Sequence, residues 1–300
     1  MSTLTSESSE SKTPVASGGS LGAATSLDIR PSGIAAAWML ARREWTRFFR
    51  QKNRVVSAVV QPLLFWLMFG AGMRGSFSWT TSGQEGFFEY FLPGTIGLIV
   101  LFTAIFATIS VIEDRREGFM QGVLVSPVGR WPVLVGKVVG GGGIAWAQAV
   151  MFLGLVLLFG MASPGIHTVY ALVLLAVMSI TLCSVGMIVA WPMTSTQGFH
   201  AVMMLFLMPM WLLSGAFFPI PAISDATSIG QSILHWIMRC NPLSYSMVEL
   251  RRLLYPEVVL ADNVWGPSSL ITWTVSLLFM VGSLVLAGWL MRGSRRADLV

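Results

Sequence analysis

One long uncharged interval limits the possible folds of this chain more than any other feature. No Asp, Glu, Lys or Arg occurs between Val138 and Ser224, and only 11% of all residues are charged. Soluble globular proteins carry about 25% charged residues, so this chain has too little charge to cover a water-facing surface. Because a bilayer accepts such apolar stretches, the sequence predicts an all-α membrane protein and excludes a soluble enzyme.

Breaks in the uncharged intervals divide them into separate spans. The interval from Val138 to Ser224 is too long for one membrane helix of about 20 residues, and Pro164-Gly165 and Trp191-Pro192 interrupt it. Backbone polar groups in lipid must pair within their own segment, so each span is expected to be a helix. Six transmembrane helices are predicted, near residues 55–73, 92–112, 138–161, 168–191, 199–218 and 269–291.

The basic residues predict how these spans are oriented. With six spans and an inner N-terminus, only four of the 19 Lys and Arg residues fall outside. The positive-inside rule therefore predicts an N-in/C-in protein. Residues 1–33, rich in Ser, Thr and Gly, are predicted to be a disordered cytoplasmic tail, and 292–300 a second tail. No cleavable signal peptide is expected, since the first long apolar run begins only at Val55.

Residues 34–50, ahead of the first span, have the pattern of an amphipathic helix. Trp38 and Trp45 share one face with other apolar side chains, whereas Arg43 and Arg47 share another. Such a helix is suited to lying in the inner headgroup region. The alternative is a simple cytoplasmic extension of the first span, and the two Trp residues favour the interfacial position.

Short helices are predicted in the long outer segment 219–266, between the fifth and sixth spans. Asn241-Pro242 is a good helix start, with Asn as the cap and Pro at the first helical position. We expect these helices to rest on the outer ends of the spans or to dip into the membrane.

The motifs of self-contained chemistry are missing from the sequence. Gly136-Lys137 is the nearest approach to a phosphate-binding loop, but it lacks the following hydroxyl residue. The three histidines are scattered, and Cys183 and Cys240 make neither a metal pattern nor a disulfide framework. The Gly-x-Ser-x-Gly motif of serine hydrolases is also absent. We therefore expect no catalytic residue and no metal or other cofactor in this chain.

The spans also lack the charges that ion-coupled transporters use. A secondary transporter carries ionisable residues at mid-membrane depth to bind protons or sodium, and the predicted spans contain none there. Energy is therefore expected from outside the chain. Gly136 and Gly140 have the spacing that permits close helix contact. Their seam is either internal or between two subunits.

The inner loop 113–132 combines a charge cluster with an apolar helical pattern. Phe119, Met120, Val123 and Leu124 follow the charges of residues 113–117 at helical spacing. A short amphipathic helix of this kind is a natural docking element for a soluble partner.

In chain order, these features resemble the type-2 ABC-transporter permeases over roughly residues 34–291. The matching segments are Phe91-Leu92-Pro93-Gly94, Glu113–Gly118, Leu124-Val125-Ser126-Pro127, Gly136-Lys137, Leu213–Pro219, Asn241–Tyr245 and Arg251-Arg252. The resemblance implies a permease subunit in the cell (inner or plasma) membrane. Its expected partners are a cytoplasmic ATPase that binds ATP and Mg²⁺, and a second permease subunit, either an identical chain or a related one. No nucleic-acid partner is expected.

The resemblance also implies roles for particular residues. The loop after the second span would dock in the ATPase through Glu113, Asp114, Arg115, Arg116, Glu117, Gly118, Phe119, Ser126 and Pro127. Family members export drugs, antibiotics, polysaccharides or lipid-linked glycans.

On the fifth span, an apolar substrate path is expected along Met203, Phe206, Met210, Trp211 and Ser214, although such a stripe would equally face lipid or the core. Two other functions remain open: a membrane scaffold without transport, and, lower, an intramembrane enzyme.

Overall fold

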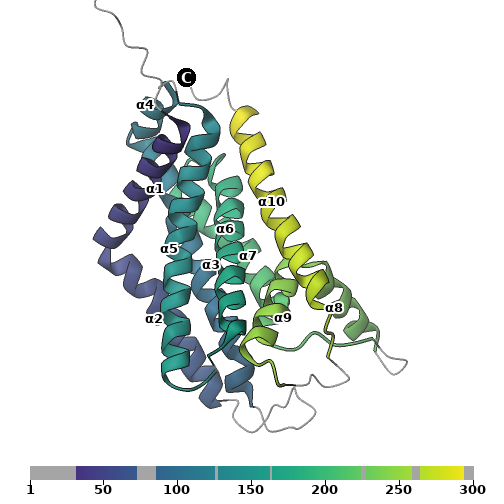
Figure 1. The fold of residues 1–300 in the computed structure, drawn as a ribbon. Helices are drawn as coiled ribbons and strands as arrows, with labels where there is room; N and C mark the ends of the chain where they lie inside the picture. Colours follow the sequence, from purple (N-terminus) through teal and green to yellow (C-terminus); the bar gives the residue numbers. More distant parts are fainter. Residues whose placement is uncertain are drawn as a thin grey trace, which may run out of the picture. The chain divides into compact units, whose positions relative to one another are not determined.

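The computed structural model describes residues 32–72, 86–125, 128–162, 164–223, 228–258 and 264–293. Helices dominate these residues, and the extended pairing among them is one isolated bridge between Pro221 and Val264. The helices are α1 (Gly33–Arg50), α2 (Lys52–Gly72), α3 (Phe87–Arg116), α4 (Phe119–Val125), α5 (Arg130–Leu158), α6 (Ile166–Ala190), α7 (Thr196–Trp211), the π-helical segment η1 (Leu212–Ala216), α8 (Ile229–Cys240), α9 (Pro242–Leu254) and α10 (Ser269–Gly293) (Figure 1). Nearly all of both predicted tails lies outside the described residues.

Five helices of the described chain are long and apolar enough to cross a membrane. They are Glu89–Arg116, Arg130–Leu158, Ile166–Ala190, Thr196–Ala216 and Ser269–Arg292. Each contains most of one of the second to sixth predicted spans, so the all-helical, multi-pass fold is confirmed. The predicted first span coincides with α2, in which Val60–Gly72 is the described apolar stretch. The first span, and with it the count of six, therefore stays a prediction, as does the N-in/C-in orientation.

Helix α3 lies at the centre of the bundle. In the most apolar 18-residue stretch of α3, 94% of the residues are buried, compared with 22% in the corresponding stretch of α10. The reason is that α3 packs against α2, α5, α6, α7 and α9, whereas α10 runs along one side and packs mainly on α6 and α9 (Figure 1). The exposed side of α10 carries Leu270, Leu278 and Trp289, a surface suited to lipid.

The glycine seam of α5 is internal. A Cβ added at Gly136 would lie 2.7 Å from the Ala37 carbonyl oxygen, and one at Gly140 would lie 2.9 Å from the Ala41 Cα. Both neighbours belong to α1, so the small residues of α5 allow α1 to pack directly on its backbone. Of the two interpretations of this spacing, the structure supports internal packing with α1.

Replacing Gly140 with Ala should therefore separate α1 from α5. The added methyl group overpacks a backbone contact, which costs about 1–3 kcal/mol, and we expect a lower melting temperature for the detergent-purified protein. Gly154→Ala is the matched control on the same helix, where an added Cβ meets no described atom within 4 Å. Equal melting temperatures for the two variants would contradict the internal seam.

Candidate functional site

A sharp turn links the central helix to the predicted docking helix. Gly118, directly after α3, has φ of 76°, a left-handed conformation that favours glycine. This turn lets α4 begin at Phe119, where the apolar pattern predicts a short helix. Met120 is buried, whereas Gln121 and Gly122 are exposed. Of the predicted coupling residues, Ser126 and Pro127 lie outside the described part of the chain.

Asp114, near the end of α3, is the centre of a group of paired charges. Its carboxylate is fully buried and accepts two hydrogen bonds from Arg43, at 2.8 Å from Nη1 and 2.7 Å from Nη2. Arg47 Nη1 donates a third at 2.5 Å. Both arginines belong to α1, so two guanidinium groups fasten α1 to the end of α3. The hydrogen bond to Asp114 raises the pKa of Arg43 above its ordinary value.

Lys137 extends this group to α5. Its ammonium pairs with Asp114 and also donates to Glu44 Oε1 of α1 at 2.6 Å. The side chains of Lys137, Glu44 and Asp114 are 2%, 4% and 0% exposed, so three helices share one buried ion network. A buried charge is tolerated when partners of opposite charge and hydrogen bonds surround it. We call Arg43, Glu44, Arg47, Glu113, Asp114 and Lys137 the ionic cluster.

Of the remaining predicted coupling residues, two contact α1 and two contact the segment between α6 and α7. Glu113 and Glu117 pair with Arg47, at 2.9 and 3.4 Å. Arg115 and Arg116 turn the other way, toward the segment that joins α6 to α7. The Arg115 guanidinium lies 4.8 Å from the ring centre of Trp191, and Arg116 donates to the carbonyl of Thr194.

Arg43 also joins the docking helix to the ionic cluster. Its guanidinium lies 3.8 Å from the centre of the Phe119 ring, within the range of a cation–π contact. Because the same side chain binds Asp114, one residue of α1 touches both α3 and α4. A displacement of α4 would therefore act on α1 and α3 together.

The predicted interfacial helix has two distinct faces, but its arginines are placed differently from expectation. Trp38 and Trp45 are 69% and 36% exposed and remain available to lipid. Arg43 and Arg47 bind carboxylates of α3. Sequence reasoning missed Glu44 as a site residue, although its spacing from Ala41 and Phe48 places it on their buried face.

A second feature is an apolar groove of about 540 Å³ between α2, α3 and α7. Of the predicted path residues only Trp211 lines it, whereas Met203 and Ser214 are fully buried and Phe206 is 63% exposed. The structure therefore does not bring the predicted path together on one surface. Sequence reasoning missed the main lining residues, which are Phe65, Phe69, Phe91, Leu98, Met204, Leu205, Met208, Pro209, Leu212, Leu213 and Phe217.

Within the described ranges no group of three or more His, Cys, Asp or Glu side chains could hold a metal ion. Cys183 is a buried thiol and Cys240 an exposed one.

Comparison with known proteins decides the family. A model of the ABC-2 type transporter family matches residues 35–255, which include α1, α4, the ionic cluster and most of the bundle. The chain belongs to the ABC-2 type transporter family. It is therefore a multi-pass membrane component of the ABC-2 transporter type.

Two curated relatives agree with this family. The "Probable multidrug ABC transporter permease YbhR" of Escherichia coli is 25% identical over 182 residues, which cover 59% of this chain and 46% of that protein. The "Putative transport permease ycf38" of Cyanophora paradoxa is 24% identical over 95 residues, 32% of this chain and 33% of that protein. This ABC-2 permease thus aligns with less than half the length of either relative.

Lys137→Met should destabilise the permease strongly. Removing one partner of a buried ion pair typically costs about 3–5 kcal/mol, since Glu44 and Asp114 would keep their charges with fewer partners. Thermal unfolding of the detergent-purified protein measures this loss.

Glu117→Gln serves as the control, because its side chain is 60% exposed and a surface pair is worth about 0–1 kcal/mol. A similar shift in the two variants would mean that the ionic cluster does not hold the helices together.

Proposed function

We propose that this chain is the membrane-spanning permease subunit of an ATP-driven exporter. It moves a hydrophobic or amphipathic substrate, such as a drug, antibiotic, lipid or glycan, out of the cytoplasm or the inner leaflet. Membership of the ABC-2 family supports this role, as does the similarity to the Escherichia coli protein named as a probable multidrug ABC transporter permease. The groove between α2 and α7, lined by Phe and Met side chains, has the chemistry that an apolar substrate needs.

The observation that carries the proposal is the attachment of α4 to three long helices. Arg43 contacts Phe119 of α4 and binds Asp114 of α3, while Lys137 of α5 pairs with Asp114 and Glu44. An ATPase that binds α4 and displaces it would therefore move α1, α3 and α5 together. Such coupling requires the ATPase to contact two permease conformations differently.

The remaining parts of the exporter follow from the same proposal. The ATPase is a separate cytoplasmic subunit that binds ATP and Mg²⁺. Residues 113–119 with Ser126 and Pro127 couple it to the bundle, with Asp114 acting from its buried position. Two copies of the permease form a homodimer in the cell membrane, each with six spans in the N-in/C-in orientation and α2 as the first span. The substrate leaves between the two copies.

The surface of α4 offers a test that spares the permease fold. Gly122 is exposed, and a Cβ added there would meet no described atom within 4 Å. Gly122→Arg should therefore leave thermal unfolding unchanged but block a partner that docks on α4. We expect permease-dependent ATP turnover to fall by about tenfold or more, which corresponds to about 1.4 kcal/mol of lost contact. The measurement is ATP hydrolysis by the co-purified complex in lipid nanodiscs.

Gly230→Arg is the matched control at the opposite end of the protein, in α8, where an added Cβ likewise meets no described atom within 4 Å. It should behave as the unmodified chain. A membrane scaffold would show neither a stable complex with an ATPase nor ATP-dependent transport. Unchanged turnover in Gly122→Arg would remove α4 as the docking element.

A further inference from the structure

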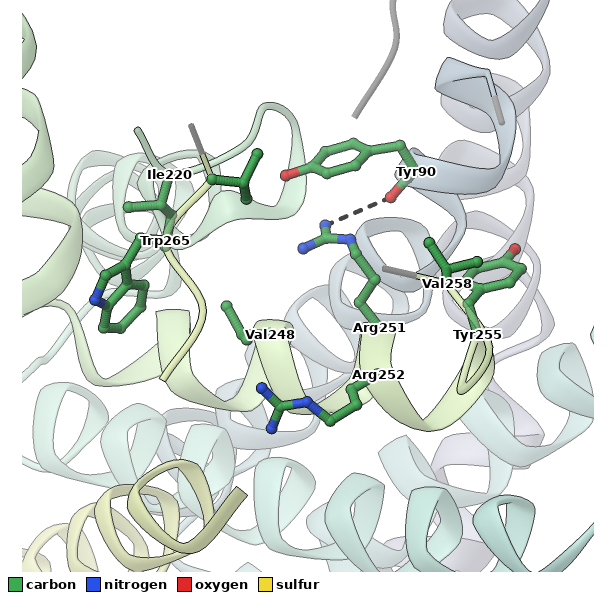
Figure 2. A pocket seen from close by; sticks show the side chains of 9 residues that line it. Tyr90, Ile220, Val248, Arg251, Arg252, Tyr255, Val258 and Trp265 are labelled. Atoms are coloured by element: carbon green, nitrogen blue, oxygen red, sulfur yellow. Dashed lines mark hydrogen bonds between the residues drawn. The ribbon is translucent and has the colours of Figure 1, made fainter. Parts of the chain in front are cut away.

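Three of the sequence segments that resemble permease motifs meet at the far end of the bundle, the end opposite α4. They are the start of α3, the segment η1 at the end of α7, and α9. Tyr90, Gly215 and Arg251 come from these three segments and lie in direct contact. Figure 2 shows Tyr90 and Arg251 at this junction, beside a small cavity.

The regular hydrogen bonding of α7 ends at this junction. Pro209 has no amide hydrogen to donate, and residues Leu212–Ala216 form a π-helical segment in which Gly215 has φ of 78°. Such a left-handed conformation favours glycine, and π-helical segments often occur at functional sites. The change of winding leaves backbone carbonyl groups of α7 and η1 available to side chains.

Side chains from α3 and α9 bind these carbonyl groups. The Gly215 carbonyl accepts hydrogen bonds from the Tyr90 hydroxyl at 2.6 Å and from Arg251 Nη2 at 2.8 Å. One turn earlier, Asn241 Nδ2 donates to the Met210 carbonyl at 2.6 Å. In the reverse direction, Trp211 Nε1 donates to the Gly94 carbonyl of α3 at 3.0 Å. The break in α7 is thus fixed by its neighbours and not by its own winding.

Arg251 contacts both the Gly215 carbonyl and Tyr90. Its guanidinium lies 3.9 Å from the centre of the Tyr90 ring, and Nη2 reaches the Tyr90 carbonyl at 3.5 Å (Figure 2). The side chain is buried, and burial lowers the pKa of Arg251 from its ordinary value. Burying a guanidinium costs free energy unless its hydrogen bonds are kept. A small shift of α9 that breaks the contacts of Arg251 would therefore be unfavourable, whereas a larger shift would expose the guanidinium to solvent.

The contact stands between two hollow regions. On one side, Phe91, Trp211 and Phe217 line the apolar groove. On the other side is a cavity of about 50 Å³, lined among others by Tyr90 and Arg251 (Figure 2). Tyr90 and Phe91 are neighbours in sequence but face different hollows, so the start of α3 forms part of the wall between them.

The fastening of α9 to α10 suggests which parts move together. Glu249 of α9 accepts hydrogen bonds from Thr272 at 2.7 Å and Trp273 at 3.1 Å, both on α10. Arg252 also pairs with Glu249 at 2.7 Å. Release of Gly215 and Tyr90 by Arg251 would therefore let α9 and α10 shift as one unit relative to α3.

We propose that Tyr90, Gly215 and Arg251 form a latch that closes the far end of the apolar groove. Substrate passes from the groove to the outside when the Gly215 carbonyl is released and η1 changes its winding. This inference rests on the proposed export function for its direction. Tyr90 and Arg251 act as positioning residues, since they hold a backbone break in place.

Cysteine labelling tests the latch without ATP or an ATPase. Met208 lines the groove one turn before η1, so Met208→Cys in a Cys240→Ser background places one thiol behind the latch, while Cys183 is buried. A membrane-impermeant maleimide is added to the outside of intact cells. We expect slow labelling that Tyr90→Phe accelerates by about two- to tenfold, the factor that one hydrogen bond contributes.

Tyr245→Phe is the matched control, because it removes the same hydroxyl group from a tyrosine of α9 that packs on Trp265, 5.3 Å away between ring centres. It should leave the labelling rate unchanged. If Tyr90→Phe labels no faster than Tyr245→Phe at equal melting temperatures, the latch is overturned. Labelling only from the cytoplasmic side would overturn its outward direction.

Arg251 gives a second variant and a readout that depends on the complex. Arg251→Gln should raise ATP turnover in the absence of substrate and lower transport per ATP, and Arg251→Lys should restore part of the coupling. If the complex shows normal ATP turnover but Tyr90→Phe leaves the labelling rate unaltered, the latch is overturned and the export function is not. Faster labelling in a permease that binds no ATPase overturns the export function and leaves the latch standing.

Discussion

The carboxylate of Asp114 is the group on which the arrangement at the α4 end depends. It is fully buried, and Arg43, Arg47 and Lys137 surround it with positive charge. Loss of any one partner would leave charge in a poorly solvated place, so the three helices that supply them are held in one register. The glycines of α5 make this possible, because only a close approach of α1 brings Glu44 within reach of Lys137.

The two ends of α3 are held by different kinds of interaction. At the α4 end, buried ion pairs join α1, α3 and α5, whereas at the far end one arginine and several neutral hydrogen bonds hold the break in α7. Neutral hydrogen bonds contribute about 1 kcal/mol each, and breaking a buried ion pair costs several times more. The proposed conformational change is therefore expected at the far end, where the π-helical segment interrupts the winding of α7.

Much of the fold could be predicted from charge and break residues, because membrane helices follow rules that act within one segment. The cap at the start of α9 is an example, since Asn241 Oδ1 accepts from the amide of Leu243 as its position before Pro242 implies. The first predicted span follows the same rules, since the uncharged run from Val55 onward coincides with α2.

The candidate site could be predicted only in part, because it depends on which helices meet. Helical periodicity places Arg43 on a polar face but does not say whether that face meets headgroups or Asp114. The same limit explains the substrate path on α7. Met203 and Met204 differ by one position, about 100° around the helix. Packing against α3 turns Met203 into the core and leaves Met204 in the groove.

Helix α3 connects the two regions physically. Tyr90 and Asp114 are 24 positions apart on it, about 36 Å at 1.5 Å per residue. In the proposed mechanism α3, most of which is buried, carries a displacement from one end to the other. Pro93 lies inside this helix near the far end, just before the Gly94 carbonyl that Trp211 binds. In that mechanism a pull on Asp114 acts at the far end on the residues that hold the Gly215 carbonyl.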